Sequence, residues 1–334
     1  MHVLIIGGTG TISRAIVREL LTQGHAVTVY NRGLRTDAPP PEVEIIRGDR
    51  SQRAAFEATL QQRTFDVAID MISFTADDAI STIRALPNIG QLIQTSTVMT
   101  YGPPFTALFQ DIDAPLNGRH DGGYGAGKVA ADEYLLGQAA AGGTPVTIVK
   151  PSFTFGPGQP LFRQVDWGTN WIDRLRKGKP IIEANEGDNY FQFLPAADAA
   201  RAYVALCGMQ AAHQRIVHVV NPTPTTWHQW HTIAAEALGV PLQTVSVPWD
   251  VLVAADASRY SALTTCLGHT QVFSPQSLLD LVPDWQPHIP LAHAVAETIE
   301  WLTVNNRIDD CATDPLEDRI IAAMRQLRGT FHTS

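Results

Sequence analysis

A tyrosine and a lysine four residues apart are the side chains of this chain best suited to acid–base chemistry. They stand in Tyr124-Gly-Ala-Gly-Lys128, at the predicted start of a helix, where positions four apart share one face. A phenol has an ordinary pKa of about 10 and is a poor base at neutral pH. An ammonium group one helical turn away stabilises the phenolate and lowers that pKa. The pair therefore indicates a proton-transfer site, although the same spacing also occurs in helices without such a role.

A glycine-rich turn near the N-terminus supplies a candidate cofactor site. It lies between a predicted strand at 3–6 and a predicted helix at 11–23, and another strand follows at 26–30. Gly7 lets the chain turn sharply off the strand, and Gly10 lets backbone amides approach a pyrophosphate at the helix N-terminus. Because the turn has this strand–helix–strand context, it predicts dinucleotide binding rather than a plain turn.

Strands and helices continue to alternate over the first half of the chain. Further strands are predicted at 43–46, 65–69, 91–94 and 145–149, and further helices at 52–61, 76–86 and 123–140. This alternation predicts an α/β fold with a doubly wound parallel sheet, a Rossmann fold. A ligand crevice is expected at the carboxyl ends of the strands. The residues that fall there are Gly7, Asp49, Asp70, Thr95 and Lys150.

The character of the sequence changes after Pro151. All seven tryptophans lie in the remainder, where the segments are shorter and richer in proline. This shift predicts a smaller, interleaved C-terminal substrate lobe. We therefore expect a dinucleotide-binding domain at 1–150 with 196–220 returning to it, a substrate-binding lobe at 151–195 and 221–312, and a tail helix at 313–334.

Composition and charge exclude several classes of protein. With 45% apolar and 17% charged residues the chain can bury a sizeable core. A net charge of −9 with no basic stripe disfavours a nucleic-acid partner. No charged leader precedes the first strand and no apolar run approaches a membrane span, so we expect a soluble, cytoplasmic protein without a membrane partner.

Cysteines and histidines give no metal assignment. The three cysteines are far apart and are expected as free thiols in a reducing compartment. His228 and His231 have helical spacing, which we interpret as one face of an amphipathic helix rather than as metal ligands. The basic run at 174–179 fits either a solvated helix end or a ligand contact.

Several motifs occur together in one order along residues 1–302. They are Gly7-Gly-Thr-Gly10-Thr-Ile-Ser13, Gly48-Asp49, Thr95-Ser-Thr97 with Tyr101-Gly102, Tyr124-x-x-x-Lys128, Pro151-Ser-Phe-Thr-Phe-Gly156 and Asn221-Pro-Thr-Pro. In these motifs the chain resembles the extended short-chain dehydrogenases/reductases, and specifically the NAD-dependent epimerase/dehydratase family typified by UDP-glucose 4-epimerase.

The resemblance implies roles for individual residues. Tyr124 would be the catalytic acid/base, Lys128 its electrostatic and ribose-binding partner, and Thr97 the group that hydrogen-bonds the reacting oxygen. Thr97 also fits a simple cap of the strand end. The cofactor-binding residues that the resemblance implies are Gly7, Thr9, Gly10, Thr11, Ile12, Asn31, Arg32, Asp49, Arg50, Met71, Ile72, Thr95, Tyr124, Lys128, Pro151 and Phe153.

Three departures from the family pattern sharpen the expectation. Ser13 replaces a third glycine, and a residue this small preserves close helix–strand packing. The second strand ends in Asn31-Arg32 rather than in an acidic residue, which favours NADP, with NAD as the alternative. Val98-Met99 stand where the family's dehydratases place Asp-Glu, so a sugar 4,6-dehydratase is not expected.

We therefore expect an NAD(P)-dependent epimerase or oxidoreductase acting on a hydroxyl or keto carbon, above all of a nucleotide sugar. The alternatives are an NADP-dependent reductase of a non-nucleotide small carbonyl compound, and a non-catalytic dinucleotide sensor or RNA-associated protein. The resemblance also implies a homodimer formed through the helices at 76–86 and 123–140. Arginines of the second lobe could hold a diphosphate, but packing and solvation explain them equally well: Arg163, Arg174, Arg176 and Arg259.

Overall fold

The computed structural model describes residues 1–34, 39–105 and 107–332, and it divides into two compact units. Unit 1 consists of residues 1–154, 194–222 and 273–288. Unit 2 consists of residues 155–193, 223–272 and 289–334. Each unit is described by itself.

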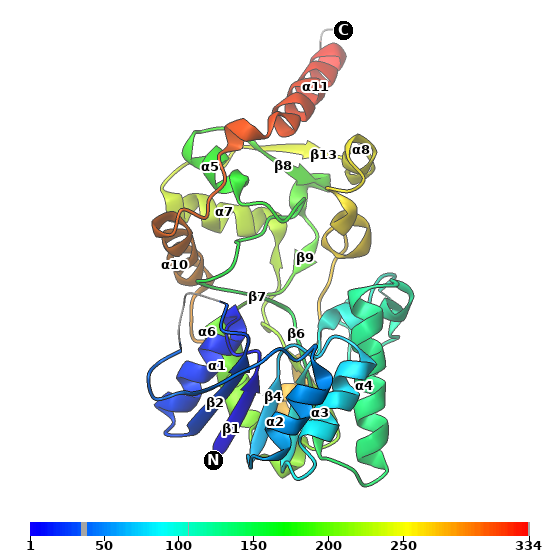
Figure 1. Ribbon diagram of the computed structural model, residues 1–334. Helices are drawn as coiled ribbons and strands as arrows, with labels where there is room; N and C mark the ends of the chain where they lie inside the picture. Colours follow the sequence, from blue (N-terminus) through cyan, green and yellow to red (C-terminus); the bar gives the residue numbers. More distant parts are fainter. Residues whose placement is uncertain (35–38, 106, 333–334) are drawn as a thin grey trace. The chain divides into compact units, whose positions relative to one another are not determined.

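Unit 1 is built on a seven-stranded parallel sheet (Figure 1), in the order β11-β6-β5-β4-β1-β2-β3. The chain runs outward from β1 in one direction and then continues from β4 in the other, so the switch point lies between β1 and β4. The α/β doubly wound fold predicted from the alternating pattern is confirmed. The strands are β1 (His2–Ile6), β2 (Ala26–Asn31), β3 (Glu44–Arg47), β4 (Val67–Asp70), β5 (Gln91–Thr95), β6 (Val146–Pro151) and β11 (Arg215–Val219).

Helices cover both faces of this sheet (Figure 1). Alternate residues of β1 enter two separate cores, Val3 and Ile5 on one face and Leu4 and Ile6 on the other. This two-sided burial explains why the strand sequences are apolar without interruption. The first face is covered by α1 (Thr11–Thr22), α6 (Ala196–Leu206) and α9 (Gln276–Leu279), and the second by α2 (Arg53–Gln61), α3 (Ala76–Ala85) and α4 (Tyr124–Ala140).

Unit 2 has shorter elements around an aromatic core. Trp171, Trp227 and Trp230 are completely buried, and the Phe193 ring stacks on Trp230 with 4.0 Å between the ring centroids. Packing in the core therefore explains half of the six tryptophans of this unit. Its elements are α5 (Asn170–Arg176), α7 (Trp227–Leu238), α8 (Trp249–Ala255), α10 (Leu291–Val304), α11 (Pro315–His332), the parallel pair β8 (Ile181–Ala184) and β13 (Thr244–Val247), and the antiparallel pair β9 (Tyr190–Phe191) and β12 (Thr225–Thr226). The short strands β7 (Phe153–Phe155) and β10 (Phe193–Pro195) pair with each other.

The division of the chain differs from the sequence-based expectation at two places. Residues 273–288 were expected in the substrate lobe but belong to unit 1, because Leu278 and Trp285 are buried in the core beside the sheet. The tail helix is grouped with unit 2, because Glu317 in its first turn is completely buried there. Residues 333–334 of the expected tail lie outside the described residues.

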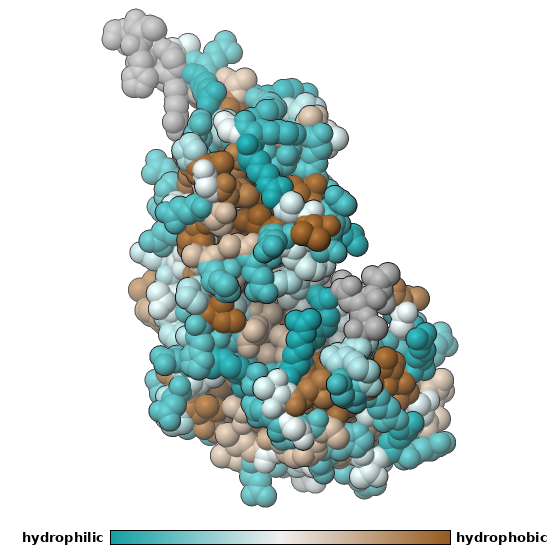
Figure 2. Space-filling view, turned by 90° about the vertical axis from the view of Figure 1, so that its left-hand side faces the viewer, coloured by the Kyte–Doolittle hydropathy of each residue, from teal (hydrophilic) through white to brown (hydrophobic). Residues whose placement is uncertain are grey.

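None of the described helices is long and apolar enough to cross a membrane. On the face shown in Figure 2, hydrophobic residues are interspersed among hydrophilic ones. The three cysteines are free and buried. Burial raises the pKa of the Cys207 thiol to about 12 and that of Cys266 to about 11, so both thiols are protonated and unreactive near neutral pH.

Candidate active site

The opening turn of unit 1 is shaped by residues without side chains. Gly7 has a φ of +111°, and a Cβ on Gly8 would lie only 2.1 Å from a methyl carbon of Val29. Ser13 fastens the turn, since its Oγ accepts from the Gly10 N–H at 2.8 Å and donates to the Gly10 carbonyl at 3.1 Å. The turn thus leads directly into the N-terminus of α1, where a pyrophosphate binds in turns of this kind. The sequence placed Gly8 in the turn but gave no reason for a glycine there, because its constraint comes from the neighbouring strand β2.

A cavity of about 540 Å³ opens beside this turn in unit 1. Seven residues implied by the resemblance line it: Gly7, Thr9, Asn31, Arg32, Asp49, Arg50 and Ile72. The sequence reasoning missed Arg53 and Asp78, which line the same cavity from the first turns of α2 and α3. Both helices begin at the carboxyl edge of the sheet, where ligands bind in folds of this kind. Their first residues could therefore have been predicted from the sequence to line the cavity.

The charged side chains at this cavity differ in how many partners they already have in the chain. Arg50 is fully paired, since its guanidinium donates to both oxygens of Asp70 at 3.0 and 2.9 Å and to the hydroxyl of Thr82 at 2.8 Å. Arg32 is exposed. Asp49 accepts from the Ser51 N–H at 2.9 Å, and this hydrogen bond, with the charge of Arg32, lowers the pKa of the Asp49 carboxyl. The cavity therefore presents the exposed Arg32, the carboxylate of Asp49, and Arg53 paired with the carboxylate of Asp78 at 3.4 Å.

Thr97 has the capping role proposed from the sequence, and its catalytic role stays a prediction. It follows β5 and caps a short 3-10 helix at Val98–Thr100, where its Oγ1 accepts from the Met99 N–H at 3.1 Å. Its side chain also acts on Tyr124, where it opposes the rise in the pKa of the phenol that burial causes. Thr97 is therefore held by its cap close to the start of α4.

The start of α4 presents Tyr124 at the surface of unit 1. Asp121, which the sequence analysis missed, accepts from the N–H groups of Gly123, Gly125 and Ala126 at 2.7, 2.8 and 3.0 Å. A carboxylate at this position satisfies the free amides of the first helical turn. The Tyr124 side chain is 50% exposed, and its ring lies 6.2 Å from that of Phe74. The helix cap thus fixes the start of α4, where Tyr124 lies.

Lys128 is buried one turn below Tyr124. Its Nζ donates to the backbone carbonyls of Ser73 at 2.7 Å and Thr95 at 2.6 Å. An ammonium group has three N–H donors, so one remains for a ligand. Burial lowers the pKa of Lys128 to about 8, against the opposing effects of Asp70 and Asp132.

The pKa of Tyr124 is raised within the chain itself. Lys128 Nζ lies 5.8 Å from the centre of the tyrosine ring. Partial burial raises the pKa of Tyr124, and the charge of Asp132 adds to that effect. The lowering expected from the lysine together with an oxidised nicotinamide stays a prediction. A phenol in this environment is protonated at neutral pH and is suited to donate a proton.

The remaining predicted cofactor residues are also in unit 1. Gly10, Thr11 and Ile12 form the start of α1. Met71 follows β4, and its sulfur accepts from the Thr95 hydroxyl at 3.1 Å. Pro151 ends β6 and Phe153 begins β7. Their roles stay predictions.

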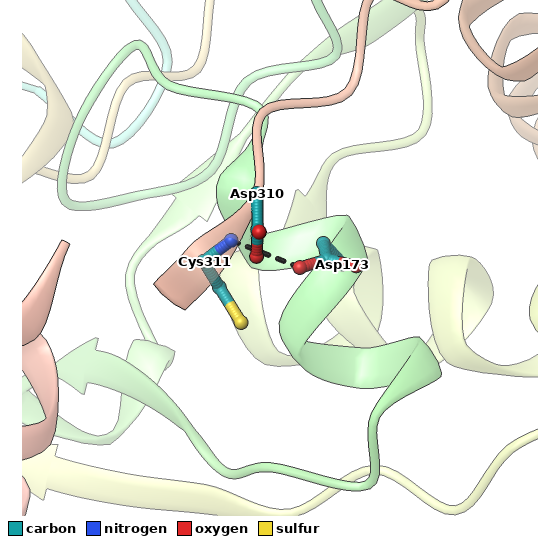
Figure 3. Close-up of side chains that lie close together, drawn as sticks. All are labelled: Asp173, Asp310 and Cys311. Carbon is teal, nitrogen blue, oxygen red and sulfur yellow. Dashed lines mark hydrogen bonds between the residues drawn. The ribbon is translucent and has the colours of Figure 1, made fainter. Parts of the chain in front are cut away.

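One group of side chains in unit 2 has the composition of a metal site (Figure 3): Asp173, Asp310 and Cys311. The Cys311 N–H donates to Asp173 at 2.9 Å. Lys177 donates to Asp173 at 2.7 Å and to Asp310 at 2.8 Å. The two carboxylates thus already share an internal cation, and we assign no metal to them.

The two histidines of α7 converge on one carboxylate. Glu183 of β8 faces His231 Nδ1 at 2.7 Å and His228 Nδ1 at 3.0 Å. His231 is completely buried, whereas His228 is half exposed. The interpretation as one face of an amphipathic helix is therefore incomplete, because both rings are bound to a buried acid. Its position on β8 could not be recognised from helical spacing.

Comparison with known proteins decides the family. The model of the NAD dependent epimerase/dehydratase family matches residues 3–219. This chain belongs to the NAD dependent epimerase/dehydratase family. It is thus an enzyme of the extended short-chain dehydrogenase/reductase type, and the glycine-rich turn described above fits the dinucleotide for which the family is named.

Relatives within and around the family differ in what they are named for. The chain is 28% identical to a 2'-dehydrokanamycin reductase of Streptomyces kanamyceticus, over 93% of this chain and 87% of that protein. It is 26% identical to the chloroplast stem-loop binding protein of 41 kDa b of Arabidopsis thaliana, over 72% of this chain and 64% of that protein. Its fold matches UDP-glucose-4-epimerase of Stenotrophomonas maltophila with bound NAD, at a TM-score of 0.74 and 15% identity, over 92% of this chain and 100% of that one.

Proposed function

We propose that this family member is an NADP-dependent reductase of a small keto compound, of sugar-like size, that carries no nucleoside diphosphate. The observation that carries the reaction type is the meeting of Tyr124 with Thr97, with the Lys128 ammonium one turn away. A relative matched over most of both chains is named a reductase, which supports the direction of the reaction.

The arginines of unit 2 support the substrate class. Arg163 is paired with Asp166 and Glu317, Arg259 with Asp166 and Asp314. Arg174 is bound by Asp318, and Arg176 by the hydroxyl of Thr303. The four arginines considered as diphosphate ligands thus already have partners in the chain, and binding a diphosphate at Arg163 or Arg174 would require breaking buried ion pairs. In the basic run at 174–179, Arg174 is buried, whereas Arg176 and Lys177 are exposed at the end of α5.

The chain's residues perform the reduction as follows. A reduced nicotinamide supplies hydride when bound. Tyr124 donates its phenolic proton to the substrate oxygen as the carbonyl carbon is reduced, so an alcohol forms and a phenolate remains. Thr97 hydrogen-bonds the same oxygen and orients it. Lys128 stabilises the phenolate by its positive charge until Tyr124 regains a proton from solvent.

The preference for NADP is supported by the charge at the cavity. Arg32 and Arg53 line it, and Asn31 stands where an acid would repel a phosphate. The carboxylates of Asp49 and Asp78 favour NAD, but Arg32 acts on the charge of Asp49 and Arg53 pairs with Asp78. We therefore expect kcat/KM for NADPH to exceed that for NADH by about tenfold, the effect of one charged contact.

The test follows oxidation of NADPH by absorbance with a panel of keto sugars, aminocyclitol ketones and UDP-sugars. We expect net oxidation of NADPH with a ketone that lacks a nucleotide, and loss of that activity in Tyr124→Phe. Conversion of a UDP-sugar to its epimer without net cofactor oxidation would instead establish the nucleotide-sugar epimerase, to which the structural neighbours give weight.

A relative named for stem-loop binding keeps RNA association as a second candidate. The net charge of −9 opposes it, because phosphate contacts require clustered positive charge. We expect no binding of an RNA stem-loop at micromolar concentration in 50 mM salt. Tight binding that weakens steeply with salt, without turnover of any ketone, would favour this candidate.

A homodimer through α3 and α4 completes the proposal. Surface residues of α4 include Ala130, Gly137 and Ala140, which are small enough for close helix packing. Sedimentation velocity is expected to give a dimer, and Ala130→Arg a monomer. A monomeric wild-type protein would reject this interface.

A further inference from the structure

A buried carboxylate lies on α4 one turn beyond the catalytic pair. Tyr124, Lys128 and Asp132 are spaced four residues apart and so share one face of the helix. Asp132 is only 2% exposed. Its Oδ2 accepts from the Ser96 hydroxyl at 2.6 Å. Ser96 is the residue before Thr97, so the carboxylate is connected to both the lysine and the threonine of the proposed site.

A second buried lysine shares this carboxylate. Lys150 of β6 has its Nζ 3.6 Å from Asp132 Oδ2 and donates to the Thr100 hydroxyl at 2.9 Å. Asp132 Oδ1 has no hydrogen-bond partner among the described residues. One carboxylate thus faces two buried ammonium groups while one of its own oxygens is left unsatisfied, an arrangement that structural stability alone does not explain.

The other charged groups around this set lie on the elements packed against α4. Tyr101, under the Lys150 ammonium at 4.5 Å, binds His218 Nε2 at 2.7 Å. Burial lowers the pKa of His218 to about 4, so it is neutral. The remaining charges act through Lys128: Asp70 of β4, Asp78 of α3 and Arg50, which is paired with Asp70.

We propose that Asp132 is a positioning residue of the reductase, whose carboxylate keeps Lys128 charged and fixes the Ser96–Thr97 segment against Tyr124. This inference rests on the proposed function for its kinetic part only. The countercharge offsets the cost of burying Lys128, and the hydrogen bond to Ser96 holds the end of β5 in register with α4. Without the carboxylate, two ammonium groups would be left in a buried region with one fewer negative charge.

The pKa values give this arrangement a signature in pH. Burial raises the pKa of Asp132 to about 6, although Lys150 and Ser96 oppose that effect. Burial lowers the pKa of Lys128 to about 8. Both groups carry their charges between these values, so kcat is expected to have an acid limb near 6 from Asp132 and an alkaline limb near 8 from Lys128.

The first experiment compares Asp132→Asn with Glu133→Gln, a neighbouring acid on the same helix that pairs with the exposed Arg119. In D132N we expect loss of the acid limb and a downward shift of the alkaline limb by about one pH unit, a tenfold change in proton affinity. Glu133→Gln is expected to keep both limbs, and Asp132→Glu to restore most of the wild-type profile. A folded D132N with the wild-type profile would overturn the inference.

The second experiment does not depend on turnover. The ¹³Cε shift of Lys128, assigned with Lys128→Met, is followed against pH by NMR. The midpoint is expected to move down in D132N and to stay in place in E133Q. If no ketone is reduced, this titration still tests the inference, so its failure is distinguishable from failure of the proposed function. An unmoved midpoint in D132N would reject the role of Asp132.

If D132N does not fold, the Ser96→Ala variant tests the role of Asp132 instead. Removal of the hydroxyl takes a donor from the ionised carboxylate, so the acid limb is expected to move up by about half a unit or more. An acid limb that stays in place in Ser96→Ala would contradict the proposal.

Discussion

Each unit of this enzyme buries charged side chains. In unit 2 the charges around Arg163 are completely paired, whereas in unit 1 the charges around Lys128 are not. In unit 2, all three nitrogens of Arg163 donate to Asp166 or Glu317, at 2.8 to 3.0 Å. Arg163 and Arg259 together hold the pKa of the Asp166 carboxyl far below its usual range in spite of burial. The charges of this network are therefore fixed at any physiological pH.

The set around Lys128 in unit 1 is incompletely paired by comparison. Burial lowers the pKa of Lys128 and Lys150 and raises that of Asp132, so each group is moved toward its neutral form. Bidentate hydrogen bonds replace the lost hydration of Arg163 in unit 2, whereas the contact between Lys150 and Asp132 at 3.6 Å does not do so for this pair. The comparison indicates that the Arg163 network serves architecture, and it supports the proposal that the set around Lys128 serves proton transfer.

The largest expected effect is on the unit 1 side, at Tyr124. Tyr124→Phe removes the proton donor, and kcat for ketone reduction is expected to fall by about 10³-fold. The midpoint of thermal unfolding is expected to change little, since the side chain is half exposed. Tyr134→Phe, on the same helix, is the matched control and is expected to retain full activity. Retained turnover in Tyr124→Phe would remove the tyrosine from the mechanism.

A substitution in the Arg163 network of unit 2 is expected to have the opposite effect, since it should lower the free energy of unfolding and leave kcat unchanged. Glu317→Ala leaves the Arg163 guanidinium with one carboxylate and uncovers the Ile182 N–H, which Glu317 binds at 3.0 Å. A loss of about 3–5 kcal/mol in the free energy of unfolding is expected, measured by urea denaturation. The kcat of the folded fraction is expected to be unchanged.

A matched control for that variant lies in the same helical turn. Asp318 also pairs with Arg174, but its side chain is 45% exposed. Asp318→Asn is therefore expected to cost less than about 1 kcal/mol. Equal losses in the two variants would show that burial of the Arg163 network does not set its contribution.

The sequence predicted the parts of unit 1 that local patterns determine. The order of strands and helices follows from apolar periodicity, and the turn at Gly7 and the Tyr124–Lys128 spacing are local signals. What it missed depends on neighbours distant in the sequence. Asp121 became visible as a helix cap only once α4 was placed, and the raised pKa of Tyr124 depends on burial, which no spacing encodes.

Unit 2 was less predictable for the same physical reason. Its arginines are as consistent with a ligand site as with ion pairs until their partners are known. The partner of Arg163 is Glu317, 154 residues away in the sequence. Residues 273–288 were misassigned because their apolar side chains complete a core formed much earlier in the chain. Long-range pairing of this kind leaves no periodic trace.

A smaller effect is expected at the cofactor cavity of unit 1. Arg32→Ala should weaken NADPH binding about tenfold, the value of one charged hydrogen bond, and leave NADH binding within about twofold. Titration of nicotinamide fluorescence measures both dissociation constants. Arg84→Ala, a basic residue in the last turn of α3, serves as the control. Equal weakening of both cofactors would show that Arg32 does not read a phosphate.

The smallest expected effect concerns His231 of unit 2 and the dependence of the free energy of unfolding on pH. Burial lowers the pKa of His231 in spite of Glu183, and its Nε2 has no hydrogen-bond partner among the described residues. Below the unfolded-state pKa of about 6.5 the unfolded chain takes up a proton that folded His231 does not, so stability falls as pH falls. Over the unit from pH 6.5 to 5.5 this amounts to at most about 1.4 kcal/mol.

His231→Gln isolates this contribution, because the amide still donates to Glu183 but does not titrate. Urea denaturation at pH 7.5 and 5.5 is expected to show a smaller acid-induced loss in His231→Gln than in the wild type. His228→Gln, at the half-exposed partner, is expected to keep the wild-type loss. The Asp166 carboxylate cannot account for a difference between these two variants, since it stays ionised over this range. The set around Asp132 cannot cause an acid-induced loss either, because the raised pKa of Asp132 lets the folded chain take up a proton before the unfolded chain does. An equal acid-induced loss in both variants would therefore show that His231 does not set the acid sensitivity.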